Sequence, residues 1–241
     1  MTAESQRQGR KGLKQFLKAR LSREEVLGLH LTVGGAALIS ATWLFAVIAE
    51  DVVNKERLSV WDVEVSNTIH AHATRAVTIA LLIITNVHST IGVAFVASVV
   101  TIYFLRRRLK YWALAFALSV FGGMVLNLLL KDIFERARPH FDDPIVTLTS
   151  YSFPSGHTIV ATTLYGALCA FVLSRIRGWF LRTVAILVAA FMIALVGFSR
   201  IYLGAHYPSD VLAAMVEGMF WLSLCLTGVH TMQRWRQVRR R

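Results

Sequence analysis

The sequence predicts an all-α fold, a polytopic membrane protein with six transmembrane helices. Three properties lead to this prediction: 55% of the 241 residues are hydrophobic, only 17% are charged, and the mean hydropathy is +0.54. These values are too apolar for an ordinary soluble domain. Because a helix needs about 20 apolar residues to cross the hydrocarbon core of a bilayer, apolar runs of that length mark the candidate spans.

Five apolar runs are long enough to cross the bilayer unaided: residues 26–49, 111–130, 156–174, 180–198 and 210–229. A sixth region, 77–105, is apolar but too long for one upright helix. Three polar residues interrupt its middle: Asn86, His88 and Ser89. We therefore expect an interfacial or partly inserted helix over 77–86 and a span from about 88 to 105. Residues 50–76 are expected to form a loop.

Basic residues set the expected orientation. With both chain ends on one side, that side carries 19 of the 26 Lys and Arg residues and the other carries 7. The positive-inside rule makes the first side cytoplasmic. The chain then divides into a basic cytoplasmic tail (1–25), a membrane domain (26–230) and a second basic cytoplasmic tail (231–241). Compact size and the lack of a eukaryotic-type targeting feature favour a bacterial inner membrane.

The net charge of +12 could indicate nucleic acid, but its distribution favours lipid. Basic residues cluster at helix ends and in the tails, where anionic headgroups attract them. No nucleic-acid partner is expected. The N-terminal tail is either a membrane-surface helix or a simple topology-setting segment. Cys169 and Cys225 fall inside predicted spans and are expected to be packing residues.

The first of three polar motifs is KDIFERARP, residues 131–139. Lys131 and Arg138 are spaced so that both cations could surround one phosphate. Arg offers a planar fork for two phosphate oxygens, whereas Lys is a movable point charge. The alternative is that both residues only anchor a helix end at the headgroups.

The second motif is PSGH, residues 154–157, at the start of the fourth expected span (156–174). Ser155 is expected to cap the following helix, whose first-turn amides form a natural anion site, and Gly156 permits close approach. His157 would then stand on the first turn beside a bound phosphate. The alternative is a capped helix start with an interfacial histidine.

The third motif is SRIYLGAHYPSD, residues 199–210. His206 and Asp210 are four residues apart, which places two side chains on one face of a helix. An aspartate that accepts one imidazole N–H leaves the other ring nitrogen free as a nucleophile. Arg200 adds a third cation. A histidine and an aspartate at a helix start could instead be only a cap.

All three motifs fall on the same expected membrane face, which the charge rule should keep poor in cations. Their residues and spacings resemble the three-part signature of the type 2 phosphatidic acid phosphatase superfamily. This superfamily includes lipid phosphate phosphatases and shares its site with vanadium haloperoxidases. The motif resemblance covers residues 131–210, and the six-helix layout extends it to most of the chain. The N-terminal tail lies outside it.

The resemblance implies a role for each motif residue. His206 would attack phosphorus to give a phosphohistidine, Asp210 would orient it, and His157 would protonate the leaving oxygen. The phosphoryl oxygens would be held by Lys131, Arg138, Ser155, the Gly156 amide and Arg200. No metal or cofactor is implied, and the pair Asp142 and Asp143 is more simply interpreted as solvated than as a metal site.

Three functions remain open. The first is hydrolysis of the terminal phosphate of a membrane lipid, with undecaprenyl diphosphate favoured and phosphatidylglycerol phosphate or phosphatidic acid as alternatives. The second is transfer of the phosphoryl group to a lipid or sugar hydroxyl, and the third is a non-catalytic lipid-binding or lipid-moving protein. Outside the signature, Glu217 is either functional or a hydrogen bond between helices, and Asn127 is expected to orient Lys131. Oligomeric state stays open.

Overall fold

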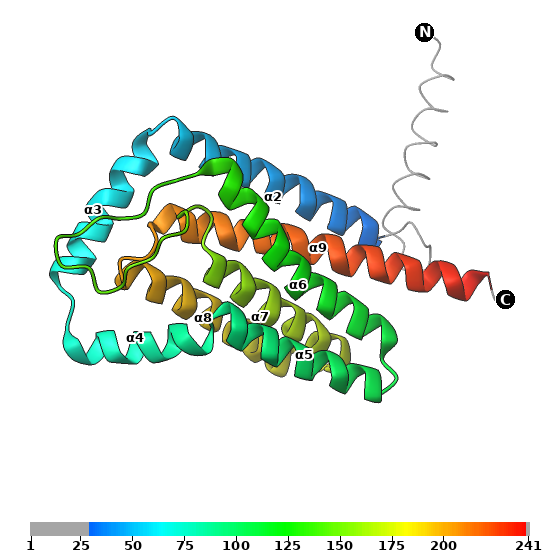
Figure 1. Ribbon diagram of the computed structural model, residues 1–241. Coiled ribbons are helices and arrows are strands. Elements are labelled where there is room, and N and C mark those ends of the chain that lie inside the picture. Colours follow the sequence, from blue (N-terminus) through cyan, green and yellow to red (C-terminus); the bar gives the residue numbers. More distant parts are fainter. Residues whose placement is uncertain (1–28, 240–241) are drawn as a thin grey trace, which may run out of the picture.

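The computed structural model describes residues 29–239, and this part of the chain is helical with no strand. The expected basic tail of residues 1–25 lies outside it. The described helices are α2 (Leu29–Val53), α3 (Arg57–Ala71), α4 (Arg75–Val87), α5 (Thr90–Arg106), α6 (Lys110–Phe134), α7 (Gly156–Arg175), α8 (Trp179–Tyr202) and α9 (Pro208–Val238) (Figure 1).

Five of these helices are long and apolar enough to cross a membrane: α2, α6, α7, α8 and α9. Helix α5 occupies the place of the remaining expected span and has 17 residues, about 25 Å at 1.5 Å per residue. Large apolar side chains point away from the bundle, with Ile39 exposed to 74%, Ile91 to 84% and Phe191 to 64%. Exposed apolar surface on this scale requires a lipid environment. The chain is therefore a multi-pass membrane protein.

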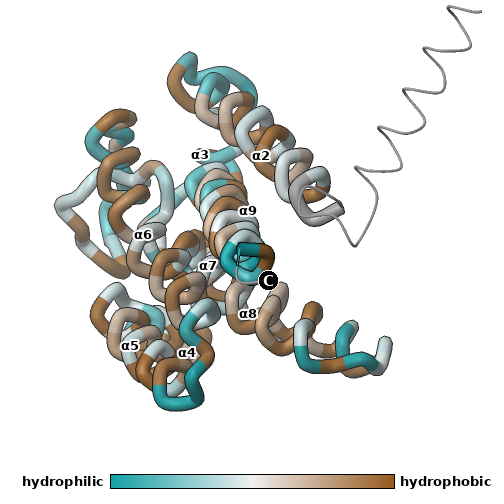
Figure 2. The backbone as a smooth tube through the Cα atoms, turned by 90° about the vertical axis from the view of Figure 1, so that its right-hand side faces the viewer, coloured by the Kyte–Doolittle hydropathy of each residue, from teal (hydrophilic) through white to brown (hydrophobic). Residues whose placement is uncertain are grey.

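Helix α9 is the centre of the bundle and packs against α2, α6 and α7 (Figure 2). Small residues allow the close approach. A Cβ atom on Gly218 would lie 2.7 Å from the Cβ of Thr162 on α7, and one on Gly34 would lie 2.5 Å from the hydroxyl of Thr227. Small residues of this kind let helix backbones come together inside a bilayer.

The prediction that residues 50–76 form a loop is wrong, because most of this segment is helix α3. This helix crosses the end of the bundle between α2 and α4 (Figure 1). The helix direction bends by 119° between α3 and α4. The backbone N–H of Thr74, between them, donates to the hydroxyl of Tyr202 at the end of α8 (2.8 Å). Helix α3 is thereby held over the end of the bundle where the polar motifs lie.

The connection from α6 to α7, residues 135–155, runs over the same end and is fixed by aromatic contacts. The ring of Phe153 is buried, with its centroid 4.9 Å from that of Phe134 and 5.9 Å from that of Phe45. Farther along, Phe141 stacks on His70 of α3 with a centroid distance of 4.0 Å. These contacts hold the long connection against α2, α3 and α6 although it has no regular structure.

Candidate active site

The three polar motifs meet at one end of the bundle, where α6 and α8 end and α7 and α9 begin. Two of the helices extend further than expected: α6 continues past Lys131 to Phe134, and α8 continues past Arg200 to Tyr202. Both cations therefore project from the last turn of a helix instead of from a loop, which fixes their backbone positions.

His206 lies in the turn between α8 and α9, with only 2% of its surface exposed. The turn requires glycine at position 204 for two reasons. The φ of Gly204 is +67°, in the left-handed region, and a Cβ atom there would lie 2.8 Å from the Phe141 ring. The imidazole Nδ1 lies 3.4 Å from Oδ2 of Asp210. The expected pair is thus present. Contrary to the prediction, the two residues do not share one face of a helix, because α9 starts at Pro208; the turn before α9 brings His206 to Asp210.

Asp210 accepts several hydrogen bonds and is fully buried. Its Oδ2 accepts from the backbone N–H of Tyr207 (2.9 Å) and from the hydroxyl of Ser152. Its Oδ1 accepts from Arg136 Nη1 at 2.6 Å. A buried carboxylate with this many donors stays ionised and cannot rotate.

Arg136 is a site residue that the sequence reasoning missed. Besides Asp210 it contacts Asp62 of α3, with Nη2 2.7 Å from Oδ2, and its guanidinium lies 4.4 Å above the Tyr207 ring. Asp62 is fully buried, and its Oδ1 accepts from the backbone N–H of Ser209 at 2.9 Å. Helix α3 therefore contributes to the site through a carboxylate. The available signal was the first arginine of KDIFERARP, a cation within a motif whose other cations were already assigned to phosphate binding.

Arg138 and Lys131 converge on one backbone carbonyl. Arg138 Nη2 donates to the carbonyl oxygen of Tyr151 at 3.0 Å, and the Lys131 ammonium donates to the same atom. Arg138 Nη1 also donates to the carbonyl of Ala205 (2.5 Å) and lies 3.2 Å from His206 Nε2. The two cations of the first motif thus stand side by side at the histidine of the third motif.

The contact between Arg138 and His206 also identifies the imidazole tautomer. A guanidinium only donates hydrogen bonds, so His206 Nε2 must be the acceptor. The neutral ring then carries its hydrogen on Nδ1, which faces Asp210. This arrangement directs the lone pair of Nε2 toward the cluster of cations.

Arg200 joins the cluster from α8 and is 4% exposed. Its Nη1 donates to the hydroxyl of Thr85 on α4 at 2.6 Å. Its Nε has no hydrogen-bond partner among the described residues. A buried guanidinium N–H without a partner is costly, and an anion bound beside it would satisfy it.

The second motif places its residues as expected, with one correction. Ser155 precedes α7, but its side chain makes no capping hydrogen bond; its hydroxyl accepts from Thr158 (3.0 Å). Its backbone N–H donates to the carbonyl of Asp210 (3.1 Å), which ties the start of α7 to that of α9. The side-chain amide of Asn127 packs against Gly156: a Cβ atom on Gly156 would lie 3.2 Å from the amide oxygen of Asn127. The first turn of α7 is therefore tightly enclosed.

His157 is on that first turn, among groups from all three motifs. Arg200, His206, His88 and Arg138 are the groups that act on it electrostatically. His88, one of the polar residues that interrupt the region 77–105, is buried, with Nε2 2.6 Å from the hydroxyl of Tyr165. The break between α4 and α5 therefore places a third imidazole near the site, besides those of His157 and His206.

Below the site, Glu217 and Asn127 form a hydrogen bond between α9 and α6. Asn127 Nδ2 donates to Glu217 Oε2 at 3.2 Å and to the carbonyl of Pro154 at 3.4 Å. No side-chain hydrogen bond joins Asn127 to Lys131, so the expected direct orientation of that lysine is not observed. The hydrogen bond between helices, one of the two interpretations of Glu217, is present.

Charge and burial determine the protonation states near the site. Burial is the largest cause of the lowering of the His206 pKa to about 3; Arg138 and Arg200 lower it further, whereas Asp210 opposes them. Burial alone would also lower the pKa of Arg136, but its two carboxylate partners outweigh burial and raise it. At neutral pH the imidazole of His206 is therefore uncharged among charged guanidiniums.

The acidic pair of the loop, Asp142 and Asp143, lies away from this cluster. Asp143 is exposed and 3.0 Å from His70 Nε2, and this hydrogen bond is the main cause of its lowered pKa. Between residues 29 and 239, no group of three or more His, Cys, Asp or Glu side chains is placed to hold a metal ion.

The bundle and this end cluster define an integral membrane protein with an aspartate-bound histidine among buried cations. The chain belongs to the PAP2 superfamily, whose family model matches residues 111–234, just over half of the sequence. Confirmation of the family thus comes from a segment that contains all three motifs.

Several curated relatives each match about half of the chain or less. Phosphatidylglycerophosphatase B of Bacillus subtilis (strain 168) is 36% identical over 132 residues, 53% of this chain and 64% of that protein. Lipid A 1-phosphatase of Rhizobium etli is 37% identical over 121 residues, 46% of this chain and 47% of that protein. Undecaprenyl-diphosphatase BcrC of Bacillus subtilis is 33% identical over 99 residues, 39% and 46% of the two chains. Each match spans less than two thirds of the relative's length.

Two solved structures share the fold. The crystal structure of a transmembrane PAP2 type phosphatidylglycerolphosphate phosphatase from Bacillus subtilis has a TM-score of 0.69 and 25% identity, covering 78% of this chain and 93% of that chain. The crystal structure of Aquifex aeolicus LpxE has a TM-score of 0.54 and 24% identity, covering 68% and 93%. The likeness extends beyond the motif region to most of the described helices.

Proposed function

We propose that this protein is a membrane lipid phosphatase that removes a terminal phosphate through a phosphohistidine at His206. The observation that carries the proposal is the pair of contacts on the imidazole: Asp210 at Nδ1 (3.4 Å) and the Arg138 guanidinium at Nε2 (3.2 Å). A neutral ring held on one nitrogen, with its other lone pair among cations, is suited to attack an anionic phosphate. The named activities of the curated relatives support the same reaction class.

In the first step, Nε2 of His206 forms a bond to phosphorus while the bond from phosphorus to the lipid oxygen breaks. The ring becomes cationic, and the Asp210 carboxylate stabilises that charge through Nδ1–H. His157 donates a proton to the leaving oxygen, so the lipid departs as an alcohol or, from a diphosphate, as a monophosphate.

In the second step, water attacks the phosphohistidine. His157, now neutral, accepts a proton from the water as its oxygen bonds to phosphorus and the bond from phosphorus to nitrogen breaks. Inorganic phosphate leaves, and His157 again carries the proton needed for the next turnover. In this mechanism His206 is the nucleophile, and His157 acts first as the acid and then as the base.

The phosphoryl oxygens would be bound by Lys131, Arg138, Arg200 and the amides at the start of α7. In the structure, Tyr151 O accepts from Lys131 and Arg138, and Arg200 Nε has no hydrogen-bond partner between residues 29 and 239. Phosphate oxygens would take over these N–H groups, and the withdrawal of Arg138 would free the Nε2 lone pair. Cations placed before the reaction stabilise the charge spread over the transferring group.

For the substrate, we propose a lipid with a terminal phosphate or diphosphate. Undecaprenyl diphosphate stays the prediction from sequence. Phosphatidylglycerol phosphate is the alternative to assay first, since the named relatives include a phosphatidylglycerophosphatase and an undecaprenyl-diphosphatase. Competition among these two lipids and phosphatidic acid on one purified sample would rank them.

For location, we propose a bacterial inner membrane with both termini in the cytoplasm and the site on the opposite face. The positive-inside rule supports this orientation, since most of the basic residues that the structure describes lie at the other end of the bundle.

The test is phosphate release from lipid by the full-length protein in detergent with a chelator present. His206→Ala should lower the rate by about a thousand-fold or more, and His140→Ala, an exposed histidine of the connection between α6 and α7, should leave it unchanged. With labelled phosphate, brief reaction and base quench should trap an acid-labile phosphohistidine on the wild type alone. Normal turnover by His206→Ala would refute the nucleophile, and label in a lipid or sugar product would make the enzyme a transferase.

A further inference from the structure

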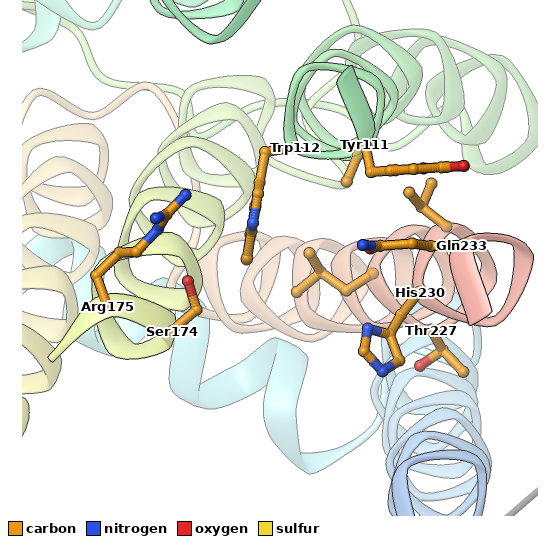
Figure 3. Close-up of a pocket in the computed structure, with 10 residues that line it drawn as sticks. Tyr111, Trp112, Ser174, Arg175, Thr227, His230 and Gln233 are labelled. Atoms are coloured by element: carbon orange, nitrogen blue, oxygen red, sulfur yellow. The ribbon is translucent and has the colours of Figure 1, made fainter. Parts of the chain in front are cut away.

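The bundle end opposite the candidate active site contains a cavity of about 610 Å³ between α6, α7 and α9. In Figure 3, Tyr111 and Trp112 reach into it from α6, Arg175 stands at one side on α7, and Gln233 lies along α9. The volume is within the range of small-molecule sites, about 300–1,000 Å³. From Tyr111 to Lys131 the distance along α6 is about 30 Å at 1.5 Å per residue, so this cavity is not part of the catalytic site.

A second cavity, of about 480 Å³, adjoins the first and is strongly basic. Its lining includes Arg106 at the end of α5, Arg107 and Arg108 in the turn that follows, and Arg175 of α7. Arg175 lines both cavities, and its guanidinium carbon lies 5.2 Å from the ring centre of Phe171. An apolar space between helices therefore opens beside a group of four arginines.

In the part of the chain that the structure describes, no carboxylate forms an ion pair with these arginines. The segments that meet at this end, 103–111, 173–183 and 224–239, contain no Asp or Glu. By contrast, Arg182 has a structural role, because its Nη1 donates to the carbonyls of Leu173 and Ile176 at the end of α7. The cationic cavity thus lacks an anion that the described protein could supply.

We propose that these two cavities form a binding site for an anionic phospholipid of the leaflet opposite the active site. The phosphate of the headgroup lies among Arg106, Arg107, Arg108 and Arg175, and an acyl chain enters the first cavity beside Trp112. Basic pockets between transmembrane helices bind anionic headgroups in this way. A free anion would use the arginines but leave the apolar cavity without an occupant. The site is independent of the reaction at His206.

The charge part of the proposal is tested by lipid binding to the full-length protein in detergent, followed by native mass spectrometry. Phosphatidylglycerol should bind about ten-fold more tightly than phosphatidylcholine with the same chains. Arg107→Gln with Arg175→Gln should remove most of this preference. The matched control, Arg177→Gln with Arg236→Gln, loses the same charge at the same end but changes no residue of either cavity, and should retain it. Equal loss in both double variants, or no headgroup preference in the wild type, would overturn the proposal.

The cavity part is tested without a change of charge. Ala115 is 3% exposed and lines the first cavity from α6. Ala115→Leu places a larger side chain there and should weaken phosphatidylglycerol binding several-fold, whereas Ala94→Leu on α5, outside both cavities, should not. Unchanged lipid binding by a folded Ala115→Leu protein, verified by thermal melting, would refute the placement of the acyl chain.

Discussion

At the scale of single residues, the environment of His206 determines the pH at which the proposed nucleophile is lost. Its pKa is lowered to about 3, primarily by burial and further by Arg138. The unfolded side chain has a pKa of 6.5, so the unfolded protein binds a proton between pH 6.5 and 3 that folded His206 does not. This histidine therefore lowers stability progressively as the pH falls through that window.

The first prediction concerns Arg138→Gln. Removal of a cation 3.2 Å from Nε2 should raise the pKa of His206, because the protonated ring is no longer repelled. A larger fraction of the nucleophile is then protonated at mildly acidic pH, so the acidic limb of kcat/KM should move to higher pH. The measurement is the position of the acidic limb in the pH–rate profile. The height of the profile is not informative, because the lost phosphate contact also lowers the rate.

Arg75→Gln is the matched control, an exposed arginine at the start of α4. It should leave both the height and the shape of the profile unchanged. An acidic limb at the wild-type position in Arg138→Gln would show that this guanidinium does not set the protonation of His206.

The second prediction concerns Asp62, which we expect to be a positioning residue that acts through Arg136 and Ser209. Asp62→Asn removes one charge from the chain of contacts that ends at Asp210, so Arg136 is held less firmly against that carboxylate. The expected result is a lower kcat with little change in KM, about ten-fold for each 1.4 kcal/mol of lost transition-state stabilisation. Steady-state kinetics on the lipid substrate measure both constants.

Asp51→Asn offers the comparison. Asp51 lies in the last turn of α2 and accepts from the backbone N–H of Leu58 in α3 at 2.9 Å, but it makes no contact with the site. A merely structural role for Asp62 would lower the thermal stability of Asp62→Asn without a selective effect on kcat, and that outcome would contradict the prediction.

At the scale of helices, close packing between α7 and α9 should be sensitive to one methyl group at Gly218. A Cβ atom there would lie 2.7 Å from two carbons of Thr162, and 3.5 Å from the Ile159 carbonyl. Gly218→Ala must therefore push the helices apart, at a cost of about 1–3 kcal/mol for overpacking. Gly228→Ala, on the same helix with nothing within 4 Å, should be neutral or stabilising. Thermal unfolding in one detergent compares the two, and equal melting temperatures would exclude this packing argument.

Some helices of this protein can be predicted from the sequence and others cannot. The long spans are predictable because apolar runs of about 20 residues have few other structures in a membrane protein. Helix α3 is not, since Asp62, Glu64 and other polar residues break its apolar pattern and its role depends on a contact with Arg136, 74 positions away. Motif spacing predicted that His206 and Asp210 meet. It could not predict the donors that hold Asp210, because they come from the irregular connection before α7.

At the scale of the whole molecule, the two ends of the bundle differ in charge, and this difference should set the orientation in the membrane. The end with the candidate active site carries few cations outside the motifs themselves. The other end carries runs such as residues 106–110 without a single acid. Because a basic segment is translocated with difficulty, the basic end should remain in the cytoplasm.

The last prediction tests this orientation with single cysteines in a chain whose Cys169 and Cys225 are replaced by alanine. Asn54→Cys lies in the exposed turn between α2 and α3, at the active-site end, and Gly178→Cys lies in the exposed turn between α7 and α8, at the basic end. A membrane-impermeant maleimide added to intact cells should label Asn54→Cys at once. It should label Gly178→Cys only after the membrane is opened, because the arginines around that turn keep it inside. The reverse pattern would place the phosphate site in the cytoplasm, and a lipid phosphate would then have to reach it from the inner leaflet.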